Sequence, residues 1–315
     1  MNSNNIIVVI IGLLVIGAVA TYFVLSGNNP ADAPTVPAEQ PTTITPPINE
    51  TPDTSVVDTP AAVATERGDS SVLGTSVAGE DITAFHFGTG AAEVVFVGGI
   101  HGGYSWNTTL LAYELIDYLD ANPTAVPANL TVTVIPVANP DGLKATVGTV
   151  GRFAPAAAAR VTEATRVEGR FNANDVDLNR NFDCEWSTSG EWQNRTVSGG
   201  AAPFSEPEAV ALRNYIENNT LAALVVWFSA EGKVYPAACG TAPTAAATSL
   251  ANTYGNAAGY PVETNFTAYQ ITGDITNWAA KQNITAISIL LTDHQSTEWT
   301  KNKAGIEAIL NSLSE

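Results

Sequence analysis

The sequence predicts an α/β domain with a mixed, mostly parallel central sheet and helices on both faces. After residue 68, apolar runs of strand length alternate with segments of helical periodicity. The expected strands cover residues 92–99, 130–138, 222–229 and 284–292, and two expected helices cover residues 107–121 and 301–313. Strands that are apolar throughout are buried on both faces, which requires helices on each side of the sheet. Ligands of such folds bind at the carboxyl ends of the strands.

A third helix is expected to start near residue 205. Ser205 is the expected N-cap, and Glu208 stands three residues later, as in a capping box. The segment Asn139-Pro-Asp-Gly142, which follows the second strand, is expected to be a turn.

Composition excludes some classes of partner. The formal net charge is −18, from 31 acidic and 13 basic residues, and 45% of the residues are apolar. Nucleic acids and anionic membrane surfaces are polyanions, so we expect neither to bind this chain through its overall charge. The apolar content is sufficient for a large core.

The N-terminal region predicts a membrane anchor followed by a stalk. Residues 6–25 carry no charge and are long enough for a helix to cross a bilayer, so residues 1–26 are expected to be a transmembrane anchor. A cleavable signal peptide is the alternative, but the basic segment that usually starts one is absent. Residues 27–67 are rich in Pro and Thr and are expected to be a disordered stalk. A domain over residues 68–315 would then lie on the extracytoplasmic side of the membrane.

Two cysteines, Cys184 and Cys239, fit an exported domain. An even and sparse count predicts one disulfide, with two free buried thiols as the alternative.

Candidate binding residues follow the expected strands. His101 follows the first strand within a glycine-rich segment, where a metal ligand or a structural histidine are both possible. Arg170 and Arg180 lie near several Asn residues and could bind a carboxylate bidentately. The alternative is an internal network in which these arginines pair with Asp175 or Asp177.

Six segments, in this order, resemble the zinc carboxypeptidase family, the carboxypeptidase A/B-like group. They are HGGYSW, NPDG, DVDLNRNF, PFSEPEA, YQITGDITNW and ISILLTDH, within residues 101–294. The resemblance covers roughly residues 70–315. In active members, a His, a Glu and a second His hold zinc, and a Glu acts as general base.

The resemblance implies a degenerate catalytic site. His101 matches the first zinc ligand, whereas Ser105 stands where the Glu ligand is expected and Ser229 where the second His is expected. Leu290 stands at the position of the general-base Glu. One imidazole does not replace three ligands, so we expect no zinc or only weak zinc binding. Leu290 cannot accept a proton, so we expect no hydrolysis.

The positions that bind substrate match better. Asn179 and Arg180 match the residues that bind the C-terminal carboxylate, and Arg170 matches the Arg that polarises the scissile carbonyl. Tyr269 matches the Tyr that closes over the substrate. Thr276 matches a residue of the side-chain pocket, where a small polar group argues against a preference for Lys or Arg.

The resulting prediction is a membrane-tethered, catalytically inactive carboxypeptidase-like domain that binds a peptide or protein C-terminus, for example of envelope peptides. One alternative is an active metallopeptidase that recruits Glu231, Asp293 or His294 as replacement ligands. Another is a structural or adhesion domain in which the arginines no longer bind a ligand.

Overall fold

The computed structural model describes residues 69–314. The expected anchor at residues 1–26 and the expected stalk at residues 27–67 lie outside the described residues. Within residues 69–314, every helix is too short or too polar to cross a membrane.

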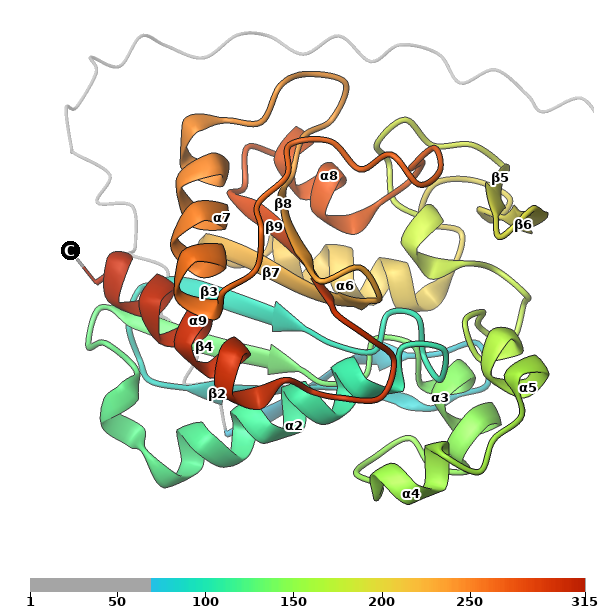
Figure 1. Ribbon diagram of the computed structural model, residues 1–315, viewed down its shortest axis with the longest axis horizontal. Helices are drawn as coiled ribbons and strands as arrows, with labels where there is room; N and C mark the ends of the chain where they lie inside the picture. Colours follow the sequence, from blue (N-terminus) through green and yellow to red (C-terminus); the bar gives the residue numbers. More distant parts are fainter. Residues whose placement is uncertain (1–68, 315) are drawn as a thin grey trace, which may run out of the picture. The chain divides into compact units, whose positions relative to one another are not determined.

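A seven-stranded mixed sheet lies at the centre of the domain, in the order β1-β2-β4-β3-β7-β9-β8 (Figure 1). The four central strands run parallel and are β4 (Leu130–Ile135), β3 (Ala92–Val97), β7 (Leu221–Ser229) and β9 (Ala286–Leu291). The strands that pair antiparallel at the two edges are β1 (Ser70–Thr75), β2 (Asp81–Phe87) and β8 (Lys233–Pro236). The predicted fold class is confirmed.

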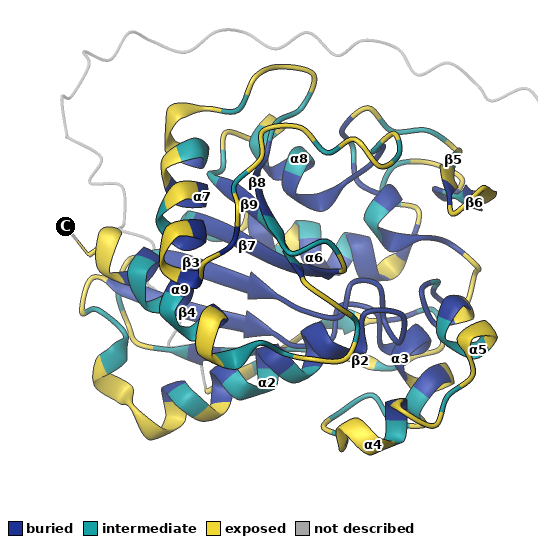
Figure 2. Ribbon diagram, viewed as in Figure 1, coloured by how far each residue is buried: buried dark blue, intermediate teal, exposed yellow. Residues whose placement is uncertain are grey.

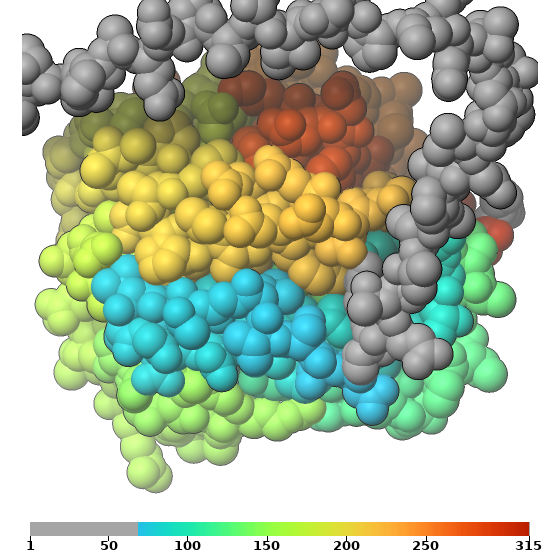
Figure 3. All heavy atoms as spheres, turned by 180° about the vertical axis from the view of Figure 1, so that it is seen from behind, coloured from blue at the N-terminus to red at the C-terminus, as the bar shows by residue number. Residues whose placement is uncertain are grey.

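Helices cover both faces of the sheet. On one face lie α2 (Trp106–Ala121), α7 (Ala245–Ala258) and α9 (Trp299–Ser312), which stand in front of the strands in Figure 1. On the other face lie α6 (Pro207–Glu217) and α8 (Ile275–Lys281). Figure 3 shows this second face, where α6 (yellow) lies against the β1–β2 hairpin (blue).

Burial on both faces explains why the central strands are apolar throughout. Along β7, Val225 and Trp227 pack under α2, α7 and α9, whereas Val226 and Phe228 pack under α6 and α8. Figure 2 shows the central strands as mostly buried. Alternate side chains therefore enter two separate cores, and neither face leaves room for a polar pattern.

Short elements follow the parallel strands. They are the helices α3 (Pro140–Val147), α4 (Pro155–Ala158) and α5 (Glu163–Glu168), and the 3-10 turns η1 (Pro123–Ala125) and η2 (Leu178–Arg180). A separate hairpin consists of β5 (Ser189–Trp192) and β6 (Arg195–Ser198). Its two-residue turn has positive φ at Gln193 (49°) and Asn194 (58°), as in a type I′ hairpin.

The prediction that Ser205 is the N-cap of α6 is wrong by one residue. Glu206, not Ser205, is the N-cap, and its side chain makes no cap hydrogen bond. Pro207 takes the first helical position, where its fixed φ suits the helix and its missing N–H costs nothing. Glu208 turns its carboxylate away from the cap and accepts a hydrogen bond from Val77 N at 3.2 Å.

The segment expected as a simple turn after β4 begins a helix. Asn139 is the N-cap of α3, and its side chain accepts a hydrogen bond from Gly142 N at 2.9 Å. Pro140 follows at the first helical position, so the Asn-Pro pair here starts a helix.

Candidate functional site

A cavity of 1120 Å³ lies at the carboxyl ends of β3, β7 and β9. The residues singled out from the sequence that line it are His101, Arg170, Asn179, Arg180, Ser229, Glu231, Tyr269, Thr276, Leu290 and His294. The fold thus gathers side chains from distant segments at the edge where ligands of α/β proteins bind. Ser105 lies outside this lining.

His101 lines the cavity and is 4% exposed. Neither ring nitrogen has a hydrogen-bond partner among residues 69–314, and Nε2 lies 3.7 Å from Asp177 Oδ1. Burial holds the pKa of His101 well below its usual value, and the nearby charges of Arg170 and Arg180 lower it further. His101 is therefore a neutral imidazole at physiological pH.

Ser105, at the position expected for a zinc-binding Glu, carries a hydroxyl, and its neighbour Tyr104 carries an aromatic ring. Tyr104 packs its ring edge-on against Trp192 at 4.9 Å and His294 at 4.5 Å, centroid to centroid. Ser105 is 1% exposed and precedes α2, and its Oγ has no partner in the described part of the chain. Neither side chain supplies a carboxylate.

The residue of β7 that faces His101 is Phe228, not Ser229. The centroids of the Phe228 and His101 rings lie 5.4 Å apart. Ser229 points elsewhere, because its Oγ donates a hydrogen bond to Asn107 Oδ1 at 2.9 Å. Neighbouring residues of a strand point to opposite faces, so only one of the two can approach His101.

Leu290 extends the apolar surface beside His101. It lines the cavity and packs against the core under α6 and α8. It also stands opposite Phe228 in the register of β7 and β9. The side chain of Leu290 itself cannot accept a proton from water.

A buried carboxylate pairs with both arginines of the site. Nε and Nη2 of Arg170 each lie 2.9 Å from Asp177 Oδ2, and Arg180 Nε lies 3.4 Å from the same oxygen. All three side chains are at most 3% exposed. Of the two uses foreseen for the arginines, the internal Arg–Asp network is present, with Asp177 as the acid.

Arg180 also donates to the protein backbone. Nη2 donates to the carbonyl oxygen of Glu191 at 2.7 Å, and Nη1 donates to Gln270 O at 3.4 Å and to Thr272 Oγ1 at 3.1 Å. The guanidinium carbon lies 5.4 Å from the ring centroid of Tyr269. The guanidinium is thus surrounded by acceptors of this chain.

Asn179 and Thr276 are joined through one carboxylate. Asn179 Nδ2 donates to Asp274 Oδ2 at 2.7 Å, and Thr276 Oγ1 donates to Asp274 Oδ1 at 2.6 Å. Asp274 caps the N-terminus of α8, and Thr276 also bonds Ser288 Oγ at 2.9 Å. Both residues therefore line the cavity and also fix the start of α8.

The residues considered as replacement zinc ligands lie in different settings. Glu231 lines the cavity but pairs with Lys233 Nζ at 3.0 Å. Asp293 is exposed, and its carboxylate accepts hydrogen bonds from the backbone N–H groups of the second and third residues that follow it. Burial lowers the pKa of His294 to about 4. Within residues 69–314, no group of three or more His, Cys, Asp or Glu side chains could hold a metal ion.

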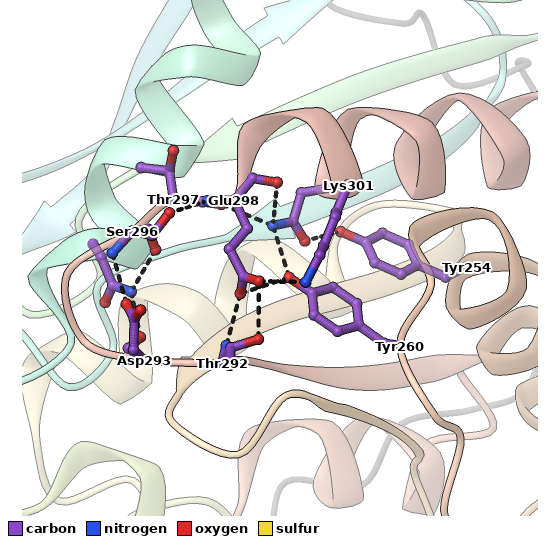
Figure 4. A network of polar contacts seen from close by, with 10 residues as sticks. Tyr254, Tyr260, Thr292, Asp293, Ser296, Thr297, Glu298 and Lys301 are labelled. Atoms are coloured by element: carbon purple, nitrogen blue, oxygen red, sulfur yellow. Dashed lines mark hydrogen bonds and ion pairs between the residues drawn. The ribbon is translucent and has the colours of Figure 1, made fainter.

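The loop that carries His294 is held by Glu298. The Glu298 carboxylate accepts hydrogen bonds from Thr292 N, Thr292 Oγ1 and Tyr260 OH at 2.7, 2.9 and 2.9 Å. It also pairs with Lys301 Nζ at 2.7 Å (Figure 4). This network ties residues 292–298 to the start of α9 and to the segment after α7.

The predicted disulfide is present. Cys184 and Cys239 are bonded across 55 residues of sequence. Their neighbours Glu185 and Gly240 both line the cavity. The bond therefore joins two walls of the site.

The family profile described as zinc carboxypeptidase matches residues 62–311. The chain belongs to the zinc carboxypeptidase family. The predicted membership is thereby confirmed, and the domain is metallocarboxypeptidase-like.

One curated relative is similar over part of the chain. The gamma-D-glutamyl-L-diamino acid endopeptidase 1 of Lysinibacillus sphaericus is 27% identical over 184 residues, which is 51% of this chain and 45% of the relative. The match therefore spans about half the length of that curated relative.

Solved structures share the fold at low sequence identity. Carboxypeptidase A from Helicoverpa armigera has a TM-score of 0.61 and 18% identity, over 78% of this chain and 66% of that one. The murein-tripeptide amidase MpaA from Escherichia coli O157 has a TM-score of 0.53 and 20% identity, over 80% and 94% of the two chains.

The side chains around His101 do not fit the zinc ion of this family. Zinc sites in proteins use three or four N, S or carboxylate ligands. Here the imidazole is faced by the ring of Phe228, and Tyr104 and Ser105 occupy the loop that should supply a carboxylate.

Three residues of the site were not anticipated from the sequence. Phe228 could have been found from strand alternation, since it points to the face opposite Ser229. Glu191 and Trp192 belong to a hairpin of two four-residue strands, which is too short to give a clear periodic pattern.

Proposed function

We propose that this chain is a non-hydrolytic member of its family, tethered on the extracytoplasmic side of a membrane, whose cavity binds a peptide by its C-terminal end. The observation that carries the proposal is the apolar contact between Phe228 and His101, with Leu290 beside it. Leu290 stands at the position of the general base, and Phe228 packs against His101, the one matched zinc ligand, while Asn179 and Arg180 still line the cavity.

The peptide partner is supported by the size and chemistry of the cavity. A volume of 1120 Å³ suits a ligand of several residues, and aromatic rings of Trp192, Tyr235 and Tyr269 line it beside the two arginines. Two relatives are named for activity on a glutamyl–diamino acid peptide and on a murein tripeptide. Envelope peptides are therefore the partners that we propose.

The membrane tether is supported by sequence alone. Residues 6–25 are uncharged and long enough to span a bilayer, and a Pro- and Thr-rich segment follows them. Membrane fractionation of cells that express the full chain tests this. Recovery in the pellet after a carbonate wash, with the domain cut by external protease, is the expected result, and a freely soluble chain would contradict it.

The loss of catalysis is tested by zinc content. The purified full-length chain is incubated with excess zinc, dialysed and measured by elemental mass spectrometry, alongside a peptidase assay. We expect zinc far below one equivalent and no hydrolysis. Near-stoichiometric zinc that is lost in His101→Ala, together with peptide cleavage, would overturn the proposal.

A structural or adhesion role is favoured by one observation. The guanidinium of Arg180 already has partners within the chain, at Asp177, Glu191, Gln270 and Thr272. If that arrangement is permanent, no peptide carboxylate binds, and Arg180→Lys leaves all ligand binding unchanged.

A further inference from the structure

The β5–β6 hairpin lies on the guanidinium of Arg180. The carbonyl oxygen of Glu191 accepts a hydrogen bond from Arg180 Nη2 at 2.7 Å, and this is the shortest hydrogen bond of that guanidinium. We propose that the hairpin is an inhibitory cap, whose backbone carbonyl occupies the place of a ligand's carboxylate oxygen. This inference rests on the proposed function, because it concerns how the same site takes a peptide C-terminus.

The backbone of the hairpin at Gly190 lies so close to Arg180 that no side chain would fit between them. A Cβ built on Gly190 would lie 2.2 Å from Arg180 Nη1 and 2.8 Å from Cζ. Any other residue would therefore push strand β5 and the guanidinium apart. Arg180 lines the cavity but is only 3% exposed, because the hairpin and the segment 270–272 both contact its guanidinium.

Two side chains anchor the hairpin over the site. Trp192 is 4% exposed, lies 4.4 Å from the guanidinium carbon of Arg170, and packs edge-on against Tyr104. Gln193, in the hairpin turn, donates from Nε2 to Tyr104 OH at 2.9 Å. A two-stranded hairpin has little stability of its own in water, so these contacts hold the cap in place.

The bonds that the cap makes to Arg180 are weaker than those that a ligand would make. A carbonyl is a neutral acceptor, whereas a carboxylate forms two charge-assisted bonds to a guanidinium, each roughly twice as strong. Arg170 and Arg180 share the single carboxylate of Asp177, so this cluster keeps one excess positive charge. A peptide C-terminus can therefore replace the carbonyl of Glu191, at the cost of moving the hairpin.

The cap predicts that loosening the hairpin strengthens binding of free C-termini alone. The apparent affinity of a ligand is its intrinsic affinity multiplied by the fraction of molecules that are uncapped. Peptides that end in an amide cannot form the paired bonds to Arg180, so their binding should depend little on the cap.

The experiment uses two mixtures of acetylated random hexapeptides, one with free carboxylates and one with C-terminal amides. Immobilised full-length protein is incubated with both mixtures, and retained peptides are quantified by mass spectrometry. The variants are Gln193→Ala and Trp192→Ala, each checked for folding by its melting temperature. Ser189→Ala is the matched control, because Ser189 is an exposed residue of the same hairpin. Gln193 and Trp192, in contrast, both contact Tyr104.

We expect the ratio of carboxylate to amide peptides retained to rise about tenfold in Gln193→Ala and not in Ser189→Ala. Adding Arg180→Lys to Gln193→Ala should abolish that rise, because Lys lacks the bidentate fork. An unchanged ratio in folded Gln193→Ala and Trp192→Ala would overturn the cap while peptide binding itself stands. Retention of neither mixture by any variant would overturn both the cap and the proposed function.

Discussion

The ring of Phe228 lies 5.4 Å from the imidazole of His101, centroid to centroid, while the next residue of the strand, Ser229, bonds Asn107. An aromatic ring thus packs against the imidazole that matches the first zinc ligand of the family. Because burial keeps His101 neutral, this ring packing requires no charge to be solvated. The contact between Phe228 and His101 makes this part of the site an apolar surface.

Geometry at the end of β7 predicts which substitution would create a metal site. Phe228→His places a second imidazole beside His101, whereas Ser229→His points its imidazole toward Asn107 and α2. We expect Phe228→His to bind zinc at least about tenfold more tightly than Ser229→His, since shared coordination needs both rings on one side. Competition with a fluorescent zinc chelator measures this. Equal zinc affinities in the two variants would contradict the placement of the Phe228 side chain beside His101.

We predict that removing the charge of Asp177 causes a large loss of stability. The carboxylate is fully buried and shared by Arg170 and Arg180, so Asp177→Asn leaves two buried guanidinium groups short of a counter-charge. Removing one partner of such a network costs about 3–5 kcal/mol. Urea unfolding followed by circular dichroism measures the free energy of unfolding.

The matched control for Asp177 is an exposed pair. Asp183 lies 2.9 Å from Lys281 Nζ, and the two side chains are 49% and 44% exposed. Asp183→Asn should change the free energy of unfolding by less than about 1 kcal/mol, because water screens such pairs. A similar loss in both variants would show that Asp177 has no special role.

We predict that removing the disulfide also causes a large loss of stability. Its removal frees a segment of 55 residues in the unfolded chain. Loop-closure entropy for that length gives about 4 kcal/mol at 25 °C, so Cys184→Ala with Cys239→Ala should lower the free energy of unfolding by that order. Dithiothreitol should reduce the stability of the wild type to that of the double variant. A wild type that is unaffected by reductant would contradict the prediction.

The fold was predictable because its four central strands are apolar runs that the chain places between helices. The strands at residues 92–97 and 221–229 were located to within two residues, as the dual cores on the sheet require. The edge strands β1, β2 and β8 were missed. β1 is exposed or half-buried along its length, β2 alternates buried and half-buried residues, and β8 has only four residues. The pairing of all three depends on neighbours that are distant in sequence.

The site was predictable in part, for a different reason. Motifs identify which residues reach the cavity, and His101, Arg170, Arg180 and Leu290 all line it. Motifs do not specify which way each side chain points, and one residue of register along β7 separates Phe228 from Ser229. Nor do they reveal that a hairpin carbonyl, that of Glu191, would bond the guanidinium of Arg180.

The burial of Glu208 makes the stability of the protein depend on pH. It is fully buried in the first turn of α6, and this burial raises its pKa to about 7, with the charge of Asp141 adding to the shift. The folded state therefore binds a proton more tightly than the unfolded state, whose carboxyl keeps a pKa near 4.5. The contribution of Glu208 to stability is fully present below about pH 4.5 and is lost as the pH rises through about 7.

Glu208→Gln should remove this dependence, because a neutral amide of the same shape does not titrate. A shift of this size corresponds to about 3 kcal/mol of unfolding free energy between roughly pH 4.5 and pH 8. Urea unfolding of wild type and variant at both values measures the difference, with Glu217→Gln, an exposed residue of the same helix, as the control. If the wild type and Glu208→Gln lose stability in parallel, Glu208 is ionised in the folded protein and its burial is offset by Val77 N and Asn172.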